Sequence, residues 1–514
     1  MICQQHLPFI ADRVETLLVA ECGETPEITN LLFSYIPSIS QFTNLRFLIL
    51  WNIPSNAIVL KVTDELQHLR NINRLDLRFN YDCNDKVDFQ LIINNIWSLQ
   101  KLTHCHYQRS SEKKCYFYPP TKLSKSLINL NLSRYCFKLA QIYQLLQYTS
   151  HLKYLSIYLE SDDNDQYKSC CFSTLIDLDI NISGICNTSK LISLLQNLPN
   201  LRRLSISLVN VINGYQLEQI IRYYLPKLKV INVSMEEKLS IGQNIEQRVD
   251  ELINSFRSSF WIDEHQWFIR CLTDERTIYI QTKPLKYSCF HAKLADTYKS
   301  TDPHDDYQEI YNTIDKLYSD SFFNQSFPSN FRLSNIEFLG IKFPIHDQFW
   351  SIVTNLKKLN SLTVSSFSDV FQSQLQTLLD RAPRLYSLCI QQDKSLPLQM
   401  SLFKCMTASV HRLDLGDDYY QFNEEECLTL SHSTLGVQCK LLFIQVINRQ
   451  SIICLVKNMI NLQSLHIECA DDKYHPENTS NKNDLVQWLK VHLPSTCLIV
   501  RNQYYIHKIK MWIR

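Results

Sequence analysis

Glycine is scarce in this chain: only 7 of its 514 residues are glycine. Loops that cradle phosphate groups and turns that present a nucleophile depend on glycine, because a residue without Cβ lets the backbone approach a ligand or adopt a positive φ. The signatures G-x-x-x-x-G-K-[ST], G-x-G-x-x-G and G-x-S-x-G are all missing, and so is the zinc signature H-E-x-x-H. The sequence therefore argues against P-loop nucleotide hydrolases, dinucleotide-binding enzymes, α/β-hydrolases and zinc proteases.

Long apolar runs and concentrated charge are missing as well. No stretch approaches the roughly 18 apolar residues that span a bilayer, and the opening "CQQHLPFIADR" lacks the basic segment and apolar core of a signal peptide. The 52 Lys and Arg residues balance 51 Asp and Glu residues, which leaves a net charge of +1. No basic stripe for a phosphate backbone is present. We expect neither a membrane nor a nucleic acid as partner.

Cysteine is present, with 18 residues, but the cysteines are scattered and several replace apolar residues. This favours buried free thiols and an intracellular protein, cytoplasmic or alternatively nuclear. The one local cluster is "THCHY", where alternation predicts His104 and His106 on the core side with Leu102, and Cys105 on the other face. One strand offers at most two of the four ligands that zinc needs, so we expect a packed histidine and no metal site.

A short pattern, L-x-x-L-x-L, recurs along the chain, with steps mostly between about 23 and 28 residues. Its fifteen windows start at Val14, Leu45, Ile72, Leu99, Leu127, Leu152, Leu175, Leu201, Leu228, Ile336, Leu359, Leu385, Val410, Leu441 and Leu462. This spacing lies in the range of leucine-rich repeats. An ordinary parallel α/β domain, the main alternative, would show no constant period.

The repeat has a physical explanation in two apolar faces. The last two apolar residues of each window alternate along a short strand and point into the core. Between windows the chain has helical stripes, such as Leu191, Leu194, Leu195 and Leu198. Neither face can be buried within one unit, so the units must stack. We predict an α/β leucine-rich-repeat solenoid (a horseshoe) with parallel strands on the concave face, helices on the convex face and a non-repeat insertion.

The repeats are interrupted once, which divides the chain into repeat block 1 (residues 1–238), an insertion or capping region (239–330) and repeat block 2 with a C-terminal cap (331–514). The insertion predicts an amphipathic helix at "IGQNIEQRVDELINSFRSSF", then a hairpin whose turn is "TDER". Polar "HDDYQEIYNTIDKLYSD" has possible helical spacing. Trp261, Trp267 and Phe268 could line a binding pocket, but we favour aromatic side chains that close the end of a repeat block.

The combination "FWIDEHQWFIRC…IYIQTKP", the renewed repeats and the ending "WLKVHLPSTCLIVRNQYYI" resemble an expanded family of invertebrate F-box-type proteins with leucine-rich repeats. The resemblance covers nearly the whole chain and implies the substrate-recognition part of a ubiquitin-ligase subunit. In that family an F-box precedes the first repeat and docks a Skp-type adaptor. Here residues 1–13 are too short for one and lead straight into a strand. We therefore expect a Skp-type adaptor as partner only if an F-box exists upstream.

Solenoids bind partners on their concave face, and the residues that flank the inward strand positions can be read from the repeat. The candidate partner-binding residues are Phe47, Trp51, Arg74, Asp76, Arg78, Tyr154, Tyr158, Asp177, Asp179 and Arg203. Nine strands spaced by about 4.8 Å give a strip of roughly 40 Å, and Tyr, Trp and Arg are common interface hot spots. The second block offers fewer such residues, namely Arg412, Asp414, His466 and Glu468.

These observations predict a protein-interaction module with no catalytic residue and no cofactor, which binds a protein target on the concave strip. One alternative is a stand-alone repeat scaffold or enzyme inhibitor without a ubiquitin role. A third hypothesis, an enzyme with its site in the insertion around His265 and Cys271, has no supporting motif.

Overall fold

The computed structural model describes residues 7–20, 28–36, 38–53, 56–79, 86–109, 117–160, 171–184, 188–283, 297–318, 322–324, 327, 331–391, 400–416, 420–472, 484–501 and 507–513. These residues form two compact units. The first unit contains the described residues up to 283 and residues 297–305, and the second contains those from 306 onward.

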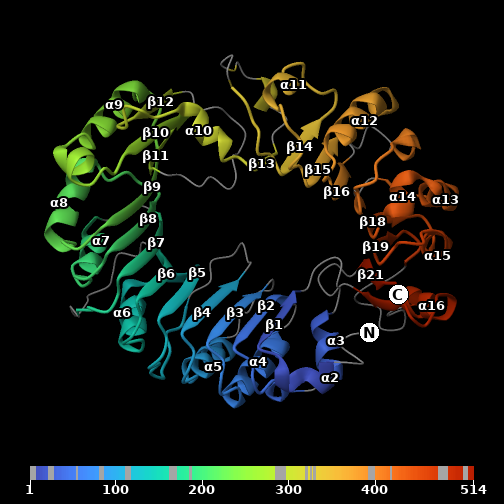
Figure 1. The fold of residues 1–514 in the computed structure, drawn as a ribbon, viewed down its shortest axis with the longest axis horizontal. Coiled ribbons are helices and arrows are strands. Elements are labelled where there is room, and N and C mark those ends of the chain that lie inside the picture. The colour runs from blue at the N-terminus through green and yellow to red at the C-terminus, as the bar shows by residue number, and fades with distance from the viewer. Residues whose placement is uncertain are drawn as a thin grey trace. The chain divides into compact units, whose positions relative to one another are not determined.

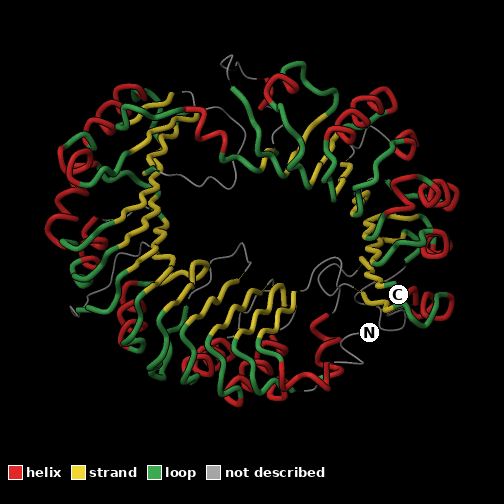
Figure 2. Tube along the Cα trace, viewed as in Figure 1, coloured by secondary structure: helices red, strands yellow, loops and turns green. Residues whose placement is uncertain are grey.

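The first unit is built on one large, mostly parallel sheet. Its nine parallel strands are β1 (Thr16–Ala20), β2 (Phe47–Ile53), β3 (Arg74–Phe79), β4 (His104–Arg109), β5 (Asn129–Phe137), β6 (Tyr154–Glu160), β7 (Asp177–Ser183), β8 (Arg203–Leu208) and β9 (Val230–Lys238). Each strand pairs with the next one along the chain, as the succession of strands in Figure 2 shows. The prediction of an α/β fold with parallel strands is confirmed, and each of the first nine windows overlaps one strand.

Burial alternates along these strands as the motif predicts. In β2, Leu48 and Leu50 are 0 % and 2 % exposed, whereas the neighbouring Phe47 and Ile49 are half-buried. In β8, Leu204 and Ile206 are buried in the same way. Burying one such side chain contributes about 1.5–3 kcal/mol, so the inward rows of the sheet supply much of the core.

Short helices follow most of the strands of the first unit and lie on one side of its sheet (Figure 1). They are α2 (Leu7–Ile10), α3 (Ile28–Tyr35), α4 (Asn56–Glu65), α5 (Lys86–Trp97), α6 (Leu139–Gln147), α7 (Thr188–Leu195) and α8 (Gly214–Tyr224). The predicted stripe Leu191, Leu194, Leu195 and Leu198 is buried. No described helix covers the other side of this sheet in Figure 1, so its strands present a second face.

Two of the predicted windows were framed incorrectly. In β4, the register pairs Leu75 with Cys105 and Leu77 with Tyr107, and both partners are buried in the core. His104 and His106 therefore lie on the opposite face from the one predicted, because the motif that matches this strand is Leu102, Cys105 and Tyr107, three residues later than the window placed at Leu99. The window at Leu441 starts two residues too late, since the register pairs Leu413 with Leu442 and Leu415 with Ile444. This shift keeps the faces as predicted, because Ile444 and Val446 are both buried.

The first sheet ends in three antiparallel strands. After β9 come α9 (Ile245–Ser255) and a short π-helix (Phe260–Glu264), then β10 (Ile269–Asp274), β11 (Thr277–Thr282) and β12 (Thr297–Ser300). The order at this end is β9, β11, β10, β12, so the predicted helix and hairpin are both confirmed. The 239–330 segment is divided, because its part up to residue 305 extends the first unit and the rest belongs to the second.

One of the few glycines lies where α8 contacts α9. A Cβ on Gly214 would lie 2.2 Å from the backbone oxygen of Ser255, and the Gly214 amide donates to Ser255 Oγ at 2.7 Å. Glycine is required here because two helices approach closely, with no phosphate-binding loop involved.

The second unit repeats the arrangement with a nine-stranded sheet, ordered β13 to β19, then β21 and β20. Its strands are β13 (Lys316–Leu317), β14 (Phe338–Lys342), β15 (Ser361–Ser365), β16 (Ser387–Gln391), β17 (Arg412–Leu415), β18 (Leu441–Val446), β19 (Ser464–Cys469), β20 (Leu498–Arg501) and β21 (Lys508–Trp512). Its helices are α10 (Tyr307–Asn312), α11 (Phe349–Ile352), α12 (Gln372–Arg381), α13 (Glu424–His432), α14 (Thr434–Gln438), α15 (Arg449–Asn458) and α16 (Asp484–His492). Strands β13 to β19 are parallel, and β21 pairs antiparallel with both β19 and β20.

Candidate partner-binding surface

The outward positions of β1–β9 form three rows across the first sheet, which we call the strand face. The strand register aligns the first row as Phe47, Arg74, His104, Asn129, Tyr154, Asp177, Arg203 and Val230. The second row includes Leu18, Ile49, Asp76, His106, Asn131, Ser156 and Asp179. The third contains Trp51, Arg78 and Gln108 near one end and Tyr158 and Asn181 further along.

All ten predicted partner-binding residues lie in these three rows. Arg74 and Arg203 are exposed, and seven of the others are half-buried. Asp76 is only 5 % exposed, which differs from the prediction of an open strip position. The predicted aromatic side chains Phe47, Trp51, Tyr154 and Tyr158 are among the half-buried ones, because neighbouring strands lie only about 4.8 Å apart and adjacent side chains within a row shield one another.

The most ordered part of the strand face surrounds Asp76. Arg78 donates to the Asp76 carboxylate through Nε and Nη2, both at 3.1 Å, and its guanidinium carbon lies 4.3 Å from the centroid of a Trp51 ring. His106 Nδ1 lies 3.4 Å from the same carboxylate. Burial raises the pKa of Asp76, but hydrogen bonds from His106 and Arg78 outweigh it and lower the pKa to about 2. Asp76 is therefore ionised and holds Arg78 in one orientation.

A second polar group lies further along the same face. Arg203 Nε donates to Asp177 at 2.7 Å, and Ser156 donates to Asp179 at 2.8 Å. Burial, followed by the charge of Asp179, raises the pKa of Tyr154, so its hydroxyl stays protonated. This end of the strand face thus combines two carboxylates with a neutral tyrosine.

The corresponding face of the second unit has fewer charged groups. The guanidinium carbon of Arg412 lies 4.8 Å from the ring centroid of Phe443, whose ring is 4.3 Å from that of His466. Asp414 pairs in register with Phe443 on the neighbouring strand. Phe443 pairs in register with His466 on this face but is not among the residues predicted for the second block.

In the insertion, His265 and Cys271 are both packed against the core at the end of the first unit. Cys271 is fully buried, and burial raises its pKa to about 12, so the thiol is protonated and a poor nucleophile. The His265 ring stacks on Trp267 at 4.0 Å between centroids, and Trp261 is buried against Phe256 at 4.9 Å. These side chains fill the end of the core, as the preferred interpretation of the aromatic residues predicted.

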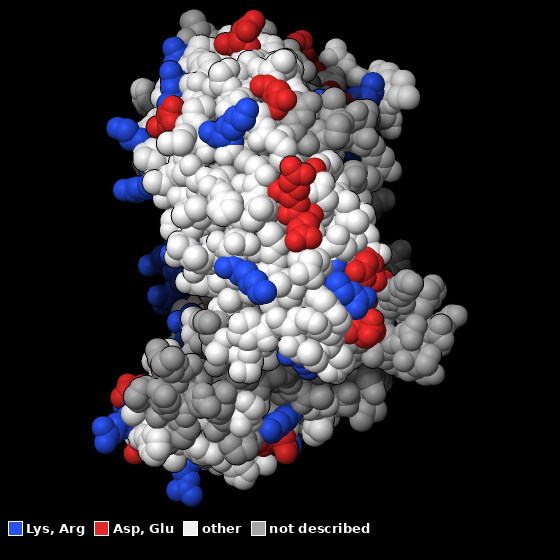
Figure 3. Space-filling model, turned by 90° about the vertical axis from the view of Figure 1, so that its right-hand side faces the viewer, with Lys and Arg blue, Asp and Glu red and all other residues white. Residues whose placement is uncertain are grey.

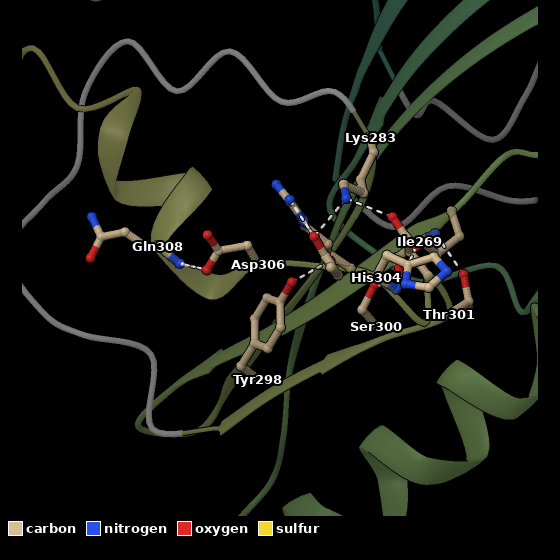
Figure 4. Close-up of polar contacts among 11 residues, drawn as sticks. Ile269, Lys283, Tyr298, Ser300, Thr301, His304, Asp306 and Gln308 are labelled. Carbon is tan, nitrogen blue, oxygen red and sulfur yellow. Dashed lines mark hydrogen bonds and ion pairs between the residues drawn. The ribbon is translucent and has the colours of Figure 1, made fainter. Parts of the chain in front are cut away.

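A buried charge network at the same end was not predicted. Arg270 of β10 is 2 % exposed, and its Nε lies 2.8 and 3.1 Å from the two carboxylate oxygens of Asp305. Lys283 Nζ lies 2.6 Å from the same carboxylate, and Tyr298 also donates to it. In Figure 4, Lys283, directly after β11, and Tyr298 of β12 point toward the centre of this network. Burial raises the pKa of Asp305, but the hydrogen bonds from Arg270, Lys283 and Tyr298 hold it well below its usual range.

The described cysteines are all free. Seven of them are buried: Cys105, Cys136, Cys271, Cys405, Cys427, Cys439 and Cys469. No group of His, Cys, Asp or Glu side chains among the described residues could hold a metal ion. Within the same residues, every helix is too short or too polar to cross a membrane.

Comparison with known proteins gives no further identification. No protein-family model matches the chain, and no curated protein sequence matches it.

Proposed function

We propose that the chain is a leucine-rich-repeat solenoid that binds a protein partner on the strand face of its first unit and performs no catalysis itself. The observation that carries this proposal is the strand face: described helices lie on one side of the sheet, while the other side presents aromatic and charged side chains in aligned rows. The recurring window, with one strand per repeat and each strand beside the next, supports the solenoid.

The mixture of charges favours a protein over a polyanion. Along the first row, the basic residues Arg74 and Arg203 are separated by the acidic Asp177. This alternation suits a specific protein contact, whereas a nucleic acid requires a continuous basic stripe. Figure 3 draws another side of the molecule, not the strand face, and there too Lys and Arg side chains of the described residues are interspersed with Asp and Glu.

The resemblance to F-box-type proteins leads us to propose that the bound protein is a target of ubiquitination. A repeat scaffold or enzyme inhibitor without a ubiquitin role is the second candidate. The two differ in one property, since only a ligase subunit would bind a Skp-type adaptor through an F-box in the native protein.

The test compares two variants of the chain in affinity capture from cells of the source organism. The Arg74→Ala/Tyr154→Ala/Asp177→Ala variant changes only the strand face. The control Tyr215→Ala/Tyr223→Ala changes two exposed tyrosines of α8, which are 55 % and 80 % exposed. We expect at least one protein to bind the wild type and the control but not the strand-face variant. If every captured protein is retained by the strand-face variant at wild-type level, the assigned surface is wrong.

A Skp-type adaptor recovered with the full native protein would favour the ligase subunit. Its absence, together with a specific strand-face partner, would favour the scaffold.

A further inference from the structure

The region around Asp76 differs from the rest of the strand face because its cation is held in place and remains accessible. Asp76 has a side chain 7 % exposed, whereas that of Arg78 is 38 % exposed. The carboxylate is thus covered while the guanidinium faces outward. The guanidinium has more N–H groups than its two contacts with Asp76 use, so donors remain for a second acceptor.

The guanidinium is restrained on two sides. The two hydrogen bonds to Asp76 fix its plane, and the Trp51 ring supports one of its faces at 4.3 Å. An arginine that is already ordered loses little conformational freedom when it binds. Arg and Trp are also the residue types in which interface energy concentrates.

The charge of this region is positive. Arg74 lies exposed on the same strand, two positions before Asp76. His104, beside Arg74 in the first row, has a pKa lowered by burial and then by the charge of Arg74, so it is neutral near pH 7. Arg74, Arg78 and the ionised Asp76 together carry a charge of +1, which a single carboxylate neutralises.

An apolar surface lies next to the Arg74–Arg78 region, on the neighbouring strands β1 and β2. Phe47 and Ile49 of β2 are half-buried in the first and second rows, and Leu18 of β1 is 54 % exposed beside Ile49. A partner segment could place an apolar side chain on these residues and an acidic side chain on Arg78.

We propose that β1–β4 form the anchor point of the strand face and bind an aspartate or glutamate side chain of the partner protein, next to an apolar side chain. Arg78 accepts the carboxylate, Asp76 is the positioning residue that orients Arg78, and Leu18, Phe47 and Ile49 contact the apolar group. This inference rests on the proposed function, because it specifies the partner chemistry of the same surface. The charge of +1 favours a carboxylate over a doubly charged phosphate.

The test selects peptides from a random display library on the full-length chain and measures their affinities by fluorescence polarisation. We expect the selected peptides to contain Asp or Glu next to Leu, Ile, Phe or Trp. Arg78→Gln should weaken their binding about 10-fold or more, because a hydrogen-bonded charge pair is lost. Arg381→Gln is the matched control, since Arg381 also stacks on a tryptophan, with its guanidinium carbon 4.2 Å from the Trp350 ring, but lies on helix α12. It should leave binding unchanged.

Changes in the peptide provide the second arm. Replacing the acidic residue by Gln should reduce the affinity as much as Arg78→Gln does. A peptide with phosphoserine at that position that binds more than 10-fold tighter would overturn the assignment to a carboxylate. If Arg78→Gln lowers the melting temperature, Arg78→Lys is measured instead. Lysine keeps the charge but cannot form a bidentate hydrogen bond to a carboxylate, so binding should still weaken.

The outcomes separate this inference from the proposed function. Peptides that lose binding to Tyr154→Ala but keep it with Arg78→Gln would leave the strand face as the binding surface and overturn the anchor. Peptides insensitive to both substitutions, or a library without any enriched sequence, would count against both proposals.

Discussion

Asp305→Asn tests whether the buried charge network holds the end of the first unit together. Asparagine keeps the shape of the side chain but removes the charge that faces Arg270, which is 2 % exposed. The side chain of Asp305 is equally buried, at 2 %. Removing one partner of a buried ion pair leaves the other charge uncompensated and costs about 3–5 kcal/mol. We expect a loss of this size in the free energy of unfolding of the first unit.

The assay is urea unfolding combined with hydrogen exchange of residues 269–283 and 297–305, because a chain with two units can unfold in more than one step. The matched control is Asp250→Asn, since Asp250 contacts Lys299 of the neighbouring strand β12 at 2.6 Å but is 56 % exposed. An exposed pair contributes at most about 1 kcal/mol. Equal effects of the two substitutions would refute the reasoning.

The pH dependence provides an independent check on Asp305. Its pKa in the folded protein lies well below the ordinary value of 3.8, so the stabilisation is complete above pH 3.8 and is lost as the pH falls further. The stability difference between wild type and Asp305→Asn should therefore be constant from pH 7 to about pH 5 and shrink below pH 3.8. Replacing both partners, as in Arg270→Met/Asp305→Leu, should recover most of the lost stability.

Three further predictions concern packing, thiol reactivity and contacts between repeats. Gly214→Ala should lower the stability by about 1–3 kcal/mol in thermal unfolding, because its Cβ would clash with the Ser255 carbonyl; a melting temperature equal to that of the wild type would show that the helices can move apart. A thiol reagent should modify exposed Cys171 in the native protein and reach buried Cys271, whose pKa is raised to about 12, only after unfolding; rapid native labelling of Cys271 would revive a reactive site there. Asn200→Ala removes a 2.7 Å hydrogen bond to the preceding repeat and should cost about 0.5–1.5 kcal/mol in urea unfolding, whereas no change would mean that water replaces it.

The position of the strands could be predicted from sequence because it depends on local spacing. Two inward residues per window, such as Leu204 and Ile206, and a helical stripe before the next window repeat at short range. The same spacing failed at the window from Leu99, because the motif that matches the strand starts three residues later, at Leu102. There the pairing of Leu75 with Cys105 on the neighbouring strand decides which side chains face the core.

The placement of the candidate site residues on one face was also predictable, because alternation along a strand requires only a correct starting residue. Their mutual contacts were not predictable. Asp76 is buried while Arg78 remains accessible to solvent. This difference depends on Trp51 and His106, which come from two other strands. The strand register brings these residues together, and the register cannot be derived from the sequence alone.

The amino-acid sequence by itself determined the repeat, the alternation of buried and outward residues, and the absence of glycine-dependent motifs, because each follows from residue type and short-range spacing. The sequence also indicates a buried charge pair that was not predicted. Arg270 stands between apolar residues in "FIRCL", and a buried arginine requires a nearby counter-charge. Only the tertiary structure decided which charge that is. Asp305 lies 35 residues further along the chain and reaches Arg270 because β12 folds back beside β10.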